Sequence, residues 1–266
     1  MISFPNCKIN LGLNILAKRE DGFHDLETIF FPVSFTDILE IIPAKAFSFQ
    51  TSGLECTSDN LCIRAYELLK QDFPLLPAVA MHLHKAIPLG SGLGGGSADA
   101  AFTLKLLNDK FLLSLSDDQF LQYAARLGSD CPFFIYNKPC LATGRGEKLN
   151  PVDLPLKGCK LVLINPGITV STSWAFSQII PSSPASHIEN IIKMPIENWK
   201  EYLFNDFEGP VFSKYPEIGE IKAFLYDSGA AYASLSGSGS TVFGIFKSDM
   251  PLPGIENYFH KIIEPA

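Results

Sequence analysis

Hydrophobic and polar residues alternate along the first part of the chain, and this period of two predicts β-strands. Within Ser3–Leu16, apolar side chains alternate with the polar residues Lys8, Asn10 and Asn14, so Lys8 and Asn10 share one face. On composition alone, Lys8 is a solvated lysine on an edge strand, because lysine is rarely buried. Further strands are predicted at 26–43, interrupted at Ser34–Asp37, and at 46–54, 79–84 and 160–165, with another ending at Phe246.

Helical spacing and capping residues predict the remaining elements. A helix is expected at 60–70 with Asp59 as its N-cap, and another at 97–108. Ser116-Asp-Asp-Gln119 has the form of a capping box and opens an amphipathic helix that Gly128 ends. Other predicted elements are a strand that starts at Pro132 and helices at 171–179, 197–202, 210–215 and 216–227.

The segment from Pro88 to Ala101, called the first glycine stretch below, places five glycines within seven residues directly before the predicted helix at 97–108. Glycines lack a Cβ and permit positive φ angles, so consecutive N–H groups can converge on an anion. The helix would direct its positive dipole end and its unpaired first-turn N–H groups at the same anion. This pattern predicts a phosphate-binding loop.

Other motifs share part of this glycine spacing. Gly90-x-Gly-x-x-Gly95 matches the dinucleotide-binding fingerprint, and Asp117 and Asp118 follow a little over twenty residues later. That fingerprint needs the acid at the end of a second strand, whereas both aspartates lie in the first turn of a predicted helix. The G-x-x-x-x-G-K-[ST] motif fails, because no lysine follows the glycines before Lys105. A glycine-rich turn without a ligand is the remaining alternative.

Composition restricts the partners and the compartment. The 266 residues are 47% hydrophobic and 18% charged, which is enough apolar material for one large domain or two of ordinary size. A net charge of −7 argues against nucleic acid or an anionic membrane as partner. The six cysteines lack metal-binding spacing, and neither a signal peptide nor an apolar membrane span is found. We expect free thiols and a cytoplasmic protein.

Several polar residues outside the first glycine stretch are candidates for chemistry. Asp130 lies in a turn beside apolar residues, so its carboxylate could accept a proton, or it could simply cap the turn. His24 is either a ligand contact or a surface histidine, and His82 and His84 are typical of a polar strand face. Ser236-Gly-Ser-Gly239, called the second glycine stretch below, is either a tight turn or a second source of N–H groups for a phosphate.

Three motifs, taken in order, resemble the GHMP kinases, the family of galactokinase, homoserine kinase and mevalonate kinase. They are the strand around Cys7-Lys-Ile-Asn-Leu11, the first glycine stretch, of P-x-x-x-G-L-G-[GS]-[GS]-S-A type, and the second glycine stretch. Shorter matches support the resemblance: Arg19-Glu-Asp-Gly-Phe-His24, Asp59-Asn-Leu61 and Gly128-Ser-Asp-Cys-Pro-Phe133. Cys7, Ser129 and Cys131 depart from the family pattern by small changes, and 180–202 gives no alignment.

The resemblance implies a two-domain α+β fold with the active site in the cleft between the domains. An N-terminal domain at 1–155, of the ribosomal protein S5 domain 2-like type, would bind ATP, and a ferredoxin-like domain at 156–266 would follow. ATP and Mg²⁺ are the implied cofactors, and no protein ligand of the metal is assigned. The residues implied to hold the nucleotide are Asn60, Lys85, Pro88, Gly90, Ser91, Gly92, Leu93, Gly94, Gly95, Gly96 and Ser97.

For catalysis, the resemblance implies Asp130 as general base toward a substrate hydroxyl and Lys8 as its cationic partner. Phosphoryl transfer needs positioning and charge neutralisation more than covalent chemistry, and these groups suit it. The implied substrate is a cytidine diphosphate-linked methylerythritol, whose base Phe23 and Phe176 would sandwich while His24 bonds its edge. The other residues implied at the substrate are Asn10, Asp130, Thr172 and Gly237.

Two alternatives stay open. Another GHMP kinase would act on a small alcohol such as homoserine or mevalonate, but those substrates carry no base for the aromatic pair to stack on. A non-catalytic nucleotide-binding protein could use the same fold, although both Lys8 and Asp130 are present. The sequence does not decide the oligomeric state, and a monomer or a weak homodimer is expected.

Overall fold

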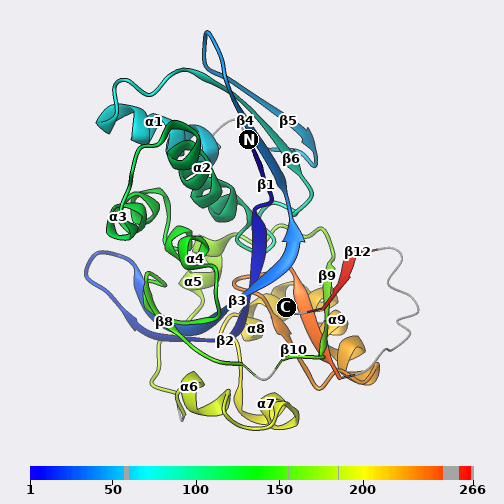
Figure 1. Ribbon diagram of the computed structural model, residues 1–266. Coiled ribbons are helices and arrows are strands. Elements are labelled where there is room, and N and C mark those ends of the chain that lie inside the picture. The colour runs from blue at the N-terminus through cyan, green and yellow to red at the C-terminus, as the bar shows by residue number, and fades with distance from the viewer. Residues whose placement is uncertain (57–59, 155, 185, 248–257, 265–266) are drawn as a thin grey trace. The chain divides into compact units, whose positions relative to one another are not determined.

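The computed structural model describes residues 1–56, 60–154, 156–184, 186–247 and 258–264, which form a mixed α+β structure (Figure 1). This confirms the expected fold class. The chain divides into two compact units. Unit 1 comprises Met1–Cys7, Phe35–Leu89 and Gly94–Lys138, and unit 2 comprises Lys8–Ser34, Gly90–Leu93 and the described residues from Pro139 onward. The predicted domain boundary at residue 155 falls outside the described ranges and stays a prediction.

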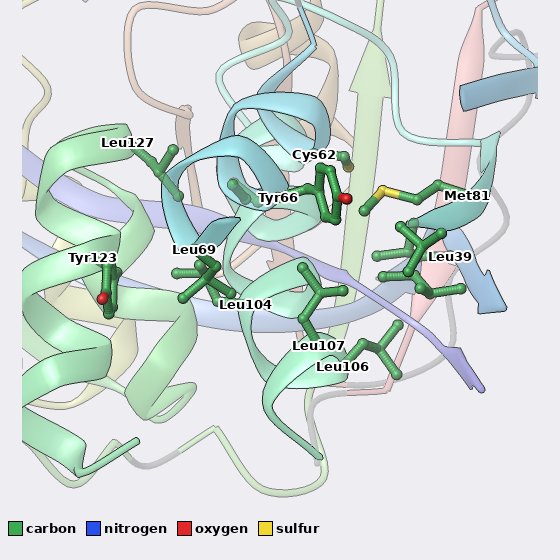
Figure 2. Packing of buried hydrophobic residues seen from close by; sticks show 14 of the residues in the cluster. Leu39, Cys62, Tyr66, Leu69, Met81, Leu104, Leu106, Leu107, Tyr123 and Leu127 are labelled. Carbon is green, nitrogen blue, oxygen red and sulfur yellow. The ribbon is translucent and has the colours of Figure 1, made fainter. Parts of the chain in front are cut away.

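Unit 1 is a sheet with helices packed on one face. Its strand order is β1 (Ile2–Ser3), β4 (Ile38–Pro43), β6 (Val79–Lys85) and β5 (Ser48–Gly53), and only the β5–β6 pair is parallel. Leu39 and Met81 of the sheet share a buried cluster with Leu69 of α1 (Leu61–Asp72) and Leu104 of α2 (Gly95–Phe111), as Figure 2 shows. The helices α3 (Asp117–Leu127) and α4 (Cys131–Tyr136) pack beside α2.

Unit 2 contains two sheets. One has the order β2 (Asn6–Lys18), β3 (His24–Thr36), β7 (Cys140–Gly144) and β8 (Lys148–Pro151). The other is antiparallel, in the order β10 (Tyr232–Leu235), β11 (Val242–Phe246), β9 (Lys160–Asn165) and β12 (Phe259–Ile263). The helices of unit 2 are α5 (Thr172–Ser177), α6 (Ile188–Ile191), α7 (Ile196–Tyr202), α8 (Glu208–Lys214) and α9 (Pro216–Asp227). No helix in the described ranges is long and apolar enough to cross a membrane.

Local capping signals are confirmed where the sequence showed them most clearly. The predicted capping box opens α3, because Gln119 N donates to Ser116 Oγ at 3.3 Å and Ser116 N donates to Gln119 Oε1 at 2.9 Å. Asn60 rather than Asp59 caps α1, since Cys62 N donates to Asn60 Oδ1 at 2.9 Å. Asp59 itself lies outside the described residues.

The strand predicted from Pro132 is wrong, because these residues form the helix α4. Proline fits the first turn of a helix, where its missing N–H would have no intrahelical partner. Asn137 then ends the helix in a left-handed conformation. A short apolar run does not by itself distinguish a buried strand from a buried helix. The interruption predicted at Ser34–Asp37 also shrinks to one residue, since β3 ends at Thr36 and β4 begins at Ile38.

Candidate active site

The first glycine stretch leads into an uncapped helix terminus in unit 1. The N-cap of α2 is Gly94, which has a left-handed conformation and no side chain to cap the helix. No acidic residue occupies the first turn of α2. First-turn N–H groups have no intrahelical acceptor, so an anion can accept from them. A Cβ at Gly95 would lie 2.9 Å from Ile87 Cγ2 and 3.2 Å from Lys85 Nζ, so a larger residue does not fit. This end of α2 therefore presents unpaired backbone N–H donors, as the prediction of an anion site requires.

The two glycine stretches are in contact within unit 2. Gly92 has a φ of +80°, and an added Cβ would lie 1.9 Å from the carbonyl oxygen of Ser236. Ser236 Oγ donates to Gly92 O at 2.9 Å, and Thr241 N donates to Ser91 O at 3.0 Å. Only a glycine permits this approach. The second glycine stretch is therefore more than an isolated turn, because it holds part of the first.

Lys8 is buried, so the prediction of a solvated lysine is wrong. Although β2 is the edge strand of its sheet, Lys8 is only 4% exposed and Asn10 only 2%. Lys8 Nζ donates to Asn10 Oδ1 at 2.5 Å, and Asn10 Nδ2 donates to Thr28 Oγ1 at 3.0 Å. Lys8 N donates to Leu93 O at 2.9 Å, which joins β2 to the first glycine stretch. A positive charge in this buried setting acts more strongly on a neighbour than a solvated one does.

Lys85 lies in a buried charge cluster of unit 1 with Asp37 and Asp99. Its ammonium pairs with Asp37 Oδ2 and lies 2.9 Å from Asp99 Oδ2, and all three side chains are almost fully buried. Asp37 Oδ1 also accepts from Ala86 N at 2.6 Å and Ile87 N at 2.9 Å. Asp37 thereby fixes the backbone directly before the first glycine stretch. Its role has no local sequence signal, because its partners lie about fifty residues away.

The protonation of this cluster follows from one cation facing two carboxylates. Burial lowers the pKa of Lys85, but Asp99 and Asp37 together outweigh burial and raise it. Burial raises the pKa of Asp99 to about 7, against the opposing effect of Lys85. Asp99 Oδ1 has no hydrogen-bond partner in the described structure. We assign the first proton that this cluster binds to Asp99, because two backbone N–H groups donate to Asp37 and, among the described residues, none is found at Asp99 Oδ1.

Asp130 occupies the N-cap position of α4, and its side chain makes no capping hydrogen bond. The neighbouring Cys131 is an inert thiol, because burial raises its pKa to about 12 although a hydrogen bond to Ser97 lowers it. Ser97 lies in the first turn of α2, so the Asp130 turn adjoins that helix terminus. Lys105 Nζ donates to two carbonyl oxygens near the end of α4, at 2.8 and 3.0 Å, and anchors α4 to α2.

Aromatic rings gather at the start of β3 in unit 2. The rings of His24 and Phe176 stack with centroids 4.9 Å apart and an interplanar angle of 19°. Phe23 is 49% exposed, and the guanidinium of Arg145 lies 4.7 Å from its ring centroid. The pairing of Leu26 with Gly144 in the β3–β7 ladder brings Arg145 to this position. Burial and the charge of Lys18 lower the pKa of His24, so its ring is neutral at pH 7.

The structure distributes the predicted residues over the two units. Unit 1 holds Asn60, Lys85, Pro88, Gly94, Gly95, Gly96, Ser97 and Asp130. Unit 2 holds Lys8, Asn10, Phe23, His24, Gly90, Ser91, Gly92, Leu93, Thr172, Phe176 and Gly237. Within unit 2, a Cβ at Gly237 would lie 3.3 Å from Gly92 O and 3.5 Å from Asn10 Oδ1, and Thr172 Oγ1 lies 3.0 Å from Ser238 Oγ. These residues of unit 2 therefore form one cluster.

Two residues with a place in this cluster were missed in the sequence. Arg145 lies in a segment whose sequence is typical of a connecting loop. The only feature that could have indicated a site there is the positive charge directly after β7. Asn205 lies between two predicted helices, and its Nδ2 donates to Leu235 O at 2.9 Å and Gly237 O at 2.8 Å. Asn205 is almost fully buried, yet its partners lie about thirty residues further along the chain.

The remaining candidates do not form a metal centre. His82 and His84 are exposed on β6 and both lie 3.0 Å from Ser52 Oγ, as expected for a polar strand face. Across the described ranges, no three His, Cys, Asp or Glu side chains gather in a way that could hold a metal ion. None of the six cysteines, all of which lie in the described ranges, forms a disulfide, in agreement with the predicted thiols.

Comparison with known proteins agrees with the motifs. The model of the GHMP kinases N terminal domain matches residues 60–138, and that of the GHMP kinases C terminal domain matches 188–262. The 4-diphosphocytidyl-2-C-methyl-D-erythritol kinase of Bacteroides fragilis is 54% identical over 256 residues, which cover 94% of this chain and 93% of the relative. The kinase of the same name from Bacteroides thetaiotaomicron is 53% identical over 260 residues, which cover 95% of this chain and 94% of the relative.

A solved structure is similar over the full length. A crystal structure of 4-(cytidine 5'-diphospho)-2C-methyl-D-erythritol kinase has a TM-score of 0.84 and 30% sequence identity, with complete coverage of both chains. The family models, the sequence relatives and this structure all indicate the same family. The chain belongs to the GHMP kinase family.

Proposed function

We propose that this protein transfers the γ-phosphoryl group of ATP to the 2-hydroxyl of 4-diphosphocytidyl-2-C-methyl-D-erythritol, in the non-mevalonate route to isoprenoid precursors. One observation carries the proposal: a kinase named for this substrate is 54% identical over 94% of the chain. The exposed Phe23 and the stacked His24 and Phe176 support it, because a cytosine base needs such a platform, whereas homoserine and mevalonate do not.

The nucleotide is held by the first glycine stretch together with Asn60 and Lys85. The uncapped N–H groups at Gly95–Ser97 donate to the phosphate oxygens, and the charge cluster of Lys85 fixes the backbone on either side of these N–H groups. Mg²⁺ supplies charge neutralisation on the phosphates when it is bound. Mg²⁺ commonly takes only one or two protein ligands beside phosphate oxygens and waters, so the site needs no multi-residue cage.

Asp130 acts as general base and Lys8 as the cation for the transferring group. The substrate oxygen forms a bond to the γ-phosphorus, the bond from that phosphorus to the bridging oxygen breaks, and ADP leaves. The proton of the 2-hydroxyl passes to the Asp130 carboxylate and later to solvent. The Lys8 ammonium donates to Asn10, and the Lys8 backbone N–H donates to Leu93 O in the first glycine stretch. From there the ammonium stabilises the negative charge on the phosphoryl oxygens.

The cytidyl substrate occupies the cluster of unit 2. Phe23 and Phe176 bind the two faces of cytosine, and the neutral His24 hydrogen-bonds its edge. Asn10, Thr172 and Gly237 contact the diphosphate and the erythritol. We place the enzyme in the cytoplasm, where its six cysteine thiols stay reduced, and expect a monomer or a weak homodimer by analytical ultracentrifugation.

The test measures ADP release from purified protein with 4-diphosphocytidyl-2-C-methyl-D-erythritol, homoserine and mevalonate as separate acceptors. Turnover with the cytidyl substrate alone is expected. Turnover with homoserine or mevalonate instead would replace the proposal with a different kinase activity. ATP binding without turnover on any acceptor would make the protein a nucleotide-binding member of the family.

An Asp130→Asn variant tests the general base. It should bind ATP and unfold like the parent, while kcat falls by roughly 10² to 10⁴, the range for loss of general base catalysis. Turnover close to that of the parent would remove Asp130 from this role.

A further inference from the structure

Four consecutive residues, three before α8 and the first residue of α8 itself, contact three separate parts of the proposed substrate cluster. They are Asn205, Asp206, Phe207 and Glu208, called the tether segment below. Asn205 and Phe207 are each 2% exposed. Nothing in the local sequence pattern indicates a role for the segment, and it carries no group that the phosphoryl transfer uses.

Asn205 holds the second glycine stretch through its amide. Its Nδ2 donates to Leu235 O at 2.9 Å and to Gly237 O at 2.8 Å, while its Oδ1 accepts from Phe207 N at 3.0 Å. In a trans peptide the carbonyl and the following N–H point in opposite directions. Because the carbonyl of Gly237 points at Asn205, the N–H of Ser238 points away from it.

The peptide that Asn205 fixes borders the residues proposed to bind the substrate. A Cβ at Gly237 would lie 3.5 Å from Asn10 Oδ1, and Ser238 Oγ lies 3.0 Å from Thr172 Oγ1. A carbonyl oxygen repels an anion, whereas a backbone N–H binds it. By holding two carbonyl oxygens of this turn, the Asn205 amide keeps them off an anionic ligand and leaves the Ser238 N–H free to face one.

The other members of the tether segment hold the surrounding parts. Asp206 Oδ2 accepts from Ile15 N at 2.6 Å, which fixes β2, the strand of Lys8 and Asn10. The ring of Phe207 packs edge-on against Phe176 with centroids 4.9 Å apart. Glu208 Oε1 accepts from Ser234 Oγ at 2.9 Å and Leu235 N at 3.0 Å, directly before the second glycine stretch.

We propose that Asn205 is a positioning residue that aims the Gly237–Ser238 peptide at the diphosphate of the cytidyl substrate. The inference rests on the proposed function, because the diphosphate belongs to that substrate. Asn205 touches neither the reacting hydroxyl nor ATP. It acts through the second glycine stretch, and the rest of the tether segment keeps that stretch in register with β2 and with Phe176.

The experiment compares the binding of CDP and of cytidine by titration calorimetry in the parent and in an Asn205→Asp variant. The variant keeps the oxygen that accepts from Phe207 N but turns the amide donor into an oxygen that repels both carbonyls. We expect its affinity for CDP to fall at least tenfold, with cytidine affinity changed less than twofold. KM for the cytidyl substrate should rise in parallel, and KM for ATP should stay within twofold.

The matched control is Tyr226→Phe. It removes another side-chain hydrogen bond to a carbonyl of β10, because Tyr226 Oη donates to Ala233 O at 3.1 Å. It should change neither CDP nor cytidine binding. Equal losses for CDP and cytidine in Asn205→Asp, or no loss for either, would overturn the proposal. A parent protein that neither binds CDP nor phosphorylates the cytidyl substrate would instead overturn the proposed function, and this inference with it.

A second measurement needs no variant and applies even if Asn205→Asp does not fold. Hydrogen exchange of the parent is followed at residues 236–241 with saturating CDP or cytidine. Slower exchange with CDP but not with cytidine is expected, because only CDP carries the diphosphate. Equal protection by both ligands, or protection by neither, would contradict the role assigned to the Gly237–Ser238 peptide.

Discussion

A single ammonium group faces two buried carboxylates in unit 1, and this imbalance makes the Asp99 side chain sensitive to pH. Asp37 is the better stabilised carboxylate, because it accepts two backbone N–H bonds besides Lys85. Asp99 has one oxygen on Lys85 and the other without a partner. Removing one partner of a buried pair is costly, but neutralising the surplus carboxylate is not.

We predict that Asp99→Asn stabilises the protein at alkaline pH. Burial raises the pKa of Asp99 from 3.8 to about 7, so the folded state holds this proton more tightly than the unfolded chain does. The stability from this protonation is complete below about pH 4 and is lost as the pH rises through about 7. Urea unfolding should show the variant more stable than the parent by about 1 to 3 kcal/mol at pH 8, and little different at pH 4.

The control for this prediction is Asp109→Asn, which neutralises an exposed carboxylate on the same helix. It should shift stability by less than about 0.5 kcal/mol at either pH, as surface changes usually do. If Asp99→Asn and the parent lose stability in parallel between pH 4 and pH 8, Asp99 is not the protonated member of the cluster.

His24 supports a second prediction at this scale. Burial and Lys18 lower the pKa of His24, so the ring becomes charged only below its ordinary value of 6.5. Cytidine, which has no phosphate to titrate, should bind with constant affinity from pH 8 to pH 6.5 and more weakly below, because the charged ring loses its acceptor nitrogen and costs desolvation. A His24→Asn variant should bind more weakly throughout and lose this dependence. The same acid dependence in the variant would exclude His24 as its source.

At the scale of elements, local signals and long-range contacts had different predictive value. The sequence predicts α3 down to its cap, because both partners of the capping box lie within one helical turn. The strand prediction fails at α4, because its six mostly apolar residues carry no period that distinguishes a buried strand from a buried helix. Composition and strand pattern alone favour a solvated Lys8, since nothing in the pattern shows that both faces of β2 are covered; only the family resemblance indicates a place in the active site.

In the candidate site, too, local features can be predicted from the sequence and long-range contacts cannot. The residue types of the first glycine stretch are enough to predict a phosphate site, because few other functions need so many glycines before a helix. The contact of Gly92 with Ser236 joins residues more than a hundred positions apart, and Asn205 meets Gly237 only in the folded chain. Such contacts have no period or cap that a sequence pattern could reveal. Family resemblance supplied the roles of Lys8 and Asp130.

The contact between the two glycine stretches can be tested by Gly92→Ala. Alanine at a φ of +80° is strained by about 1 to 2 kcal/mol, and its Cβ would also meet the Ser236 carbonyl oxygen at 1.9 Å. The two stretches must separate, so we expect kcat/KM to fall by roughly a hundredfold or more, as misplacement by about 1 Å can cause. Steady-state kinetics with the cytidyl substrate and ATP measure this loss.

Gly158→Ala provides the matched control, because Gly158 has the same φ of +80° but no atom within 4 Å of an added Cβ. Backbone strain should lower its free energy of unfolding by about 1 to 2 kcal/mol, as in Gly92→Ala. Its turnover should equal that of the parent. Equal kinetic losses in the two variants would mean that backbone strain alone, and not the approach of Gly92 to Ser236, causes the defect.

At the scale of the whole molecule, the proposed reaction requires an acidic protein to bind two anionic reactants. The net charge of −7 repels both at a distance, so affinity depends on local groups. In the described structure, our candidates for these groups are the buried Lys8, the partly buried Arg145 and the backbone N–H groups of the two glycine stretches. These groups keep their effect at physiological salt better than exposed charges do.

ATP and the cytidyl substrate are assigned to different groups, so the two ligands should protect different segments of the chain from hydrogen exchange. A non-hydrolysable ATP analogue should slow exchange at 90–104 and near Asn60, because the nucleotide accepts from the first-turn N–H groups of α2. CDP should slow exchange at 22–28, 172–178 and 236–241, which contain the aromatic rings and the second glycine stretch. Each ligand, at a hundred times its Kd, adds about 2.7 kcal/mol to the free energy of unfolding, and this slows exchange throughout the chain. Exchange in β12 measures this general slowing, which is then subtracted from the protection found elsewhere. If CDP protects α1 and α2 as strongly as the ATP analogue does, the assignment of the cytidyl substrate to the unit 2 cluster is wrong.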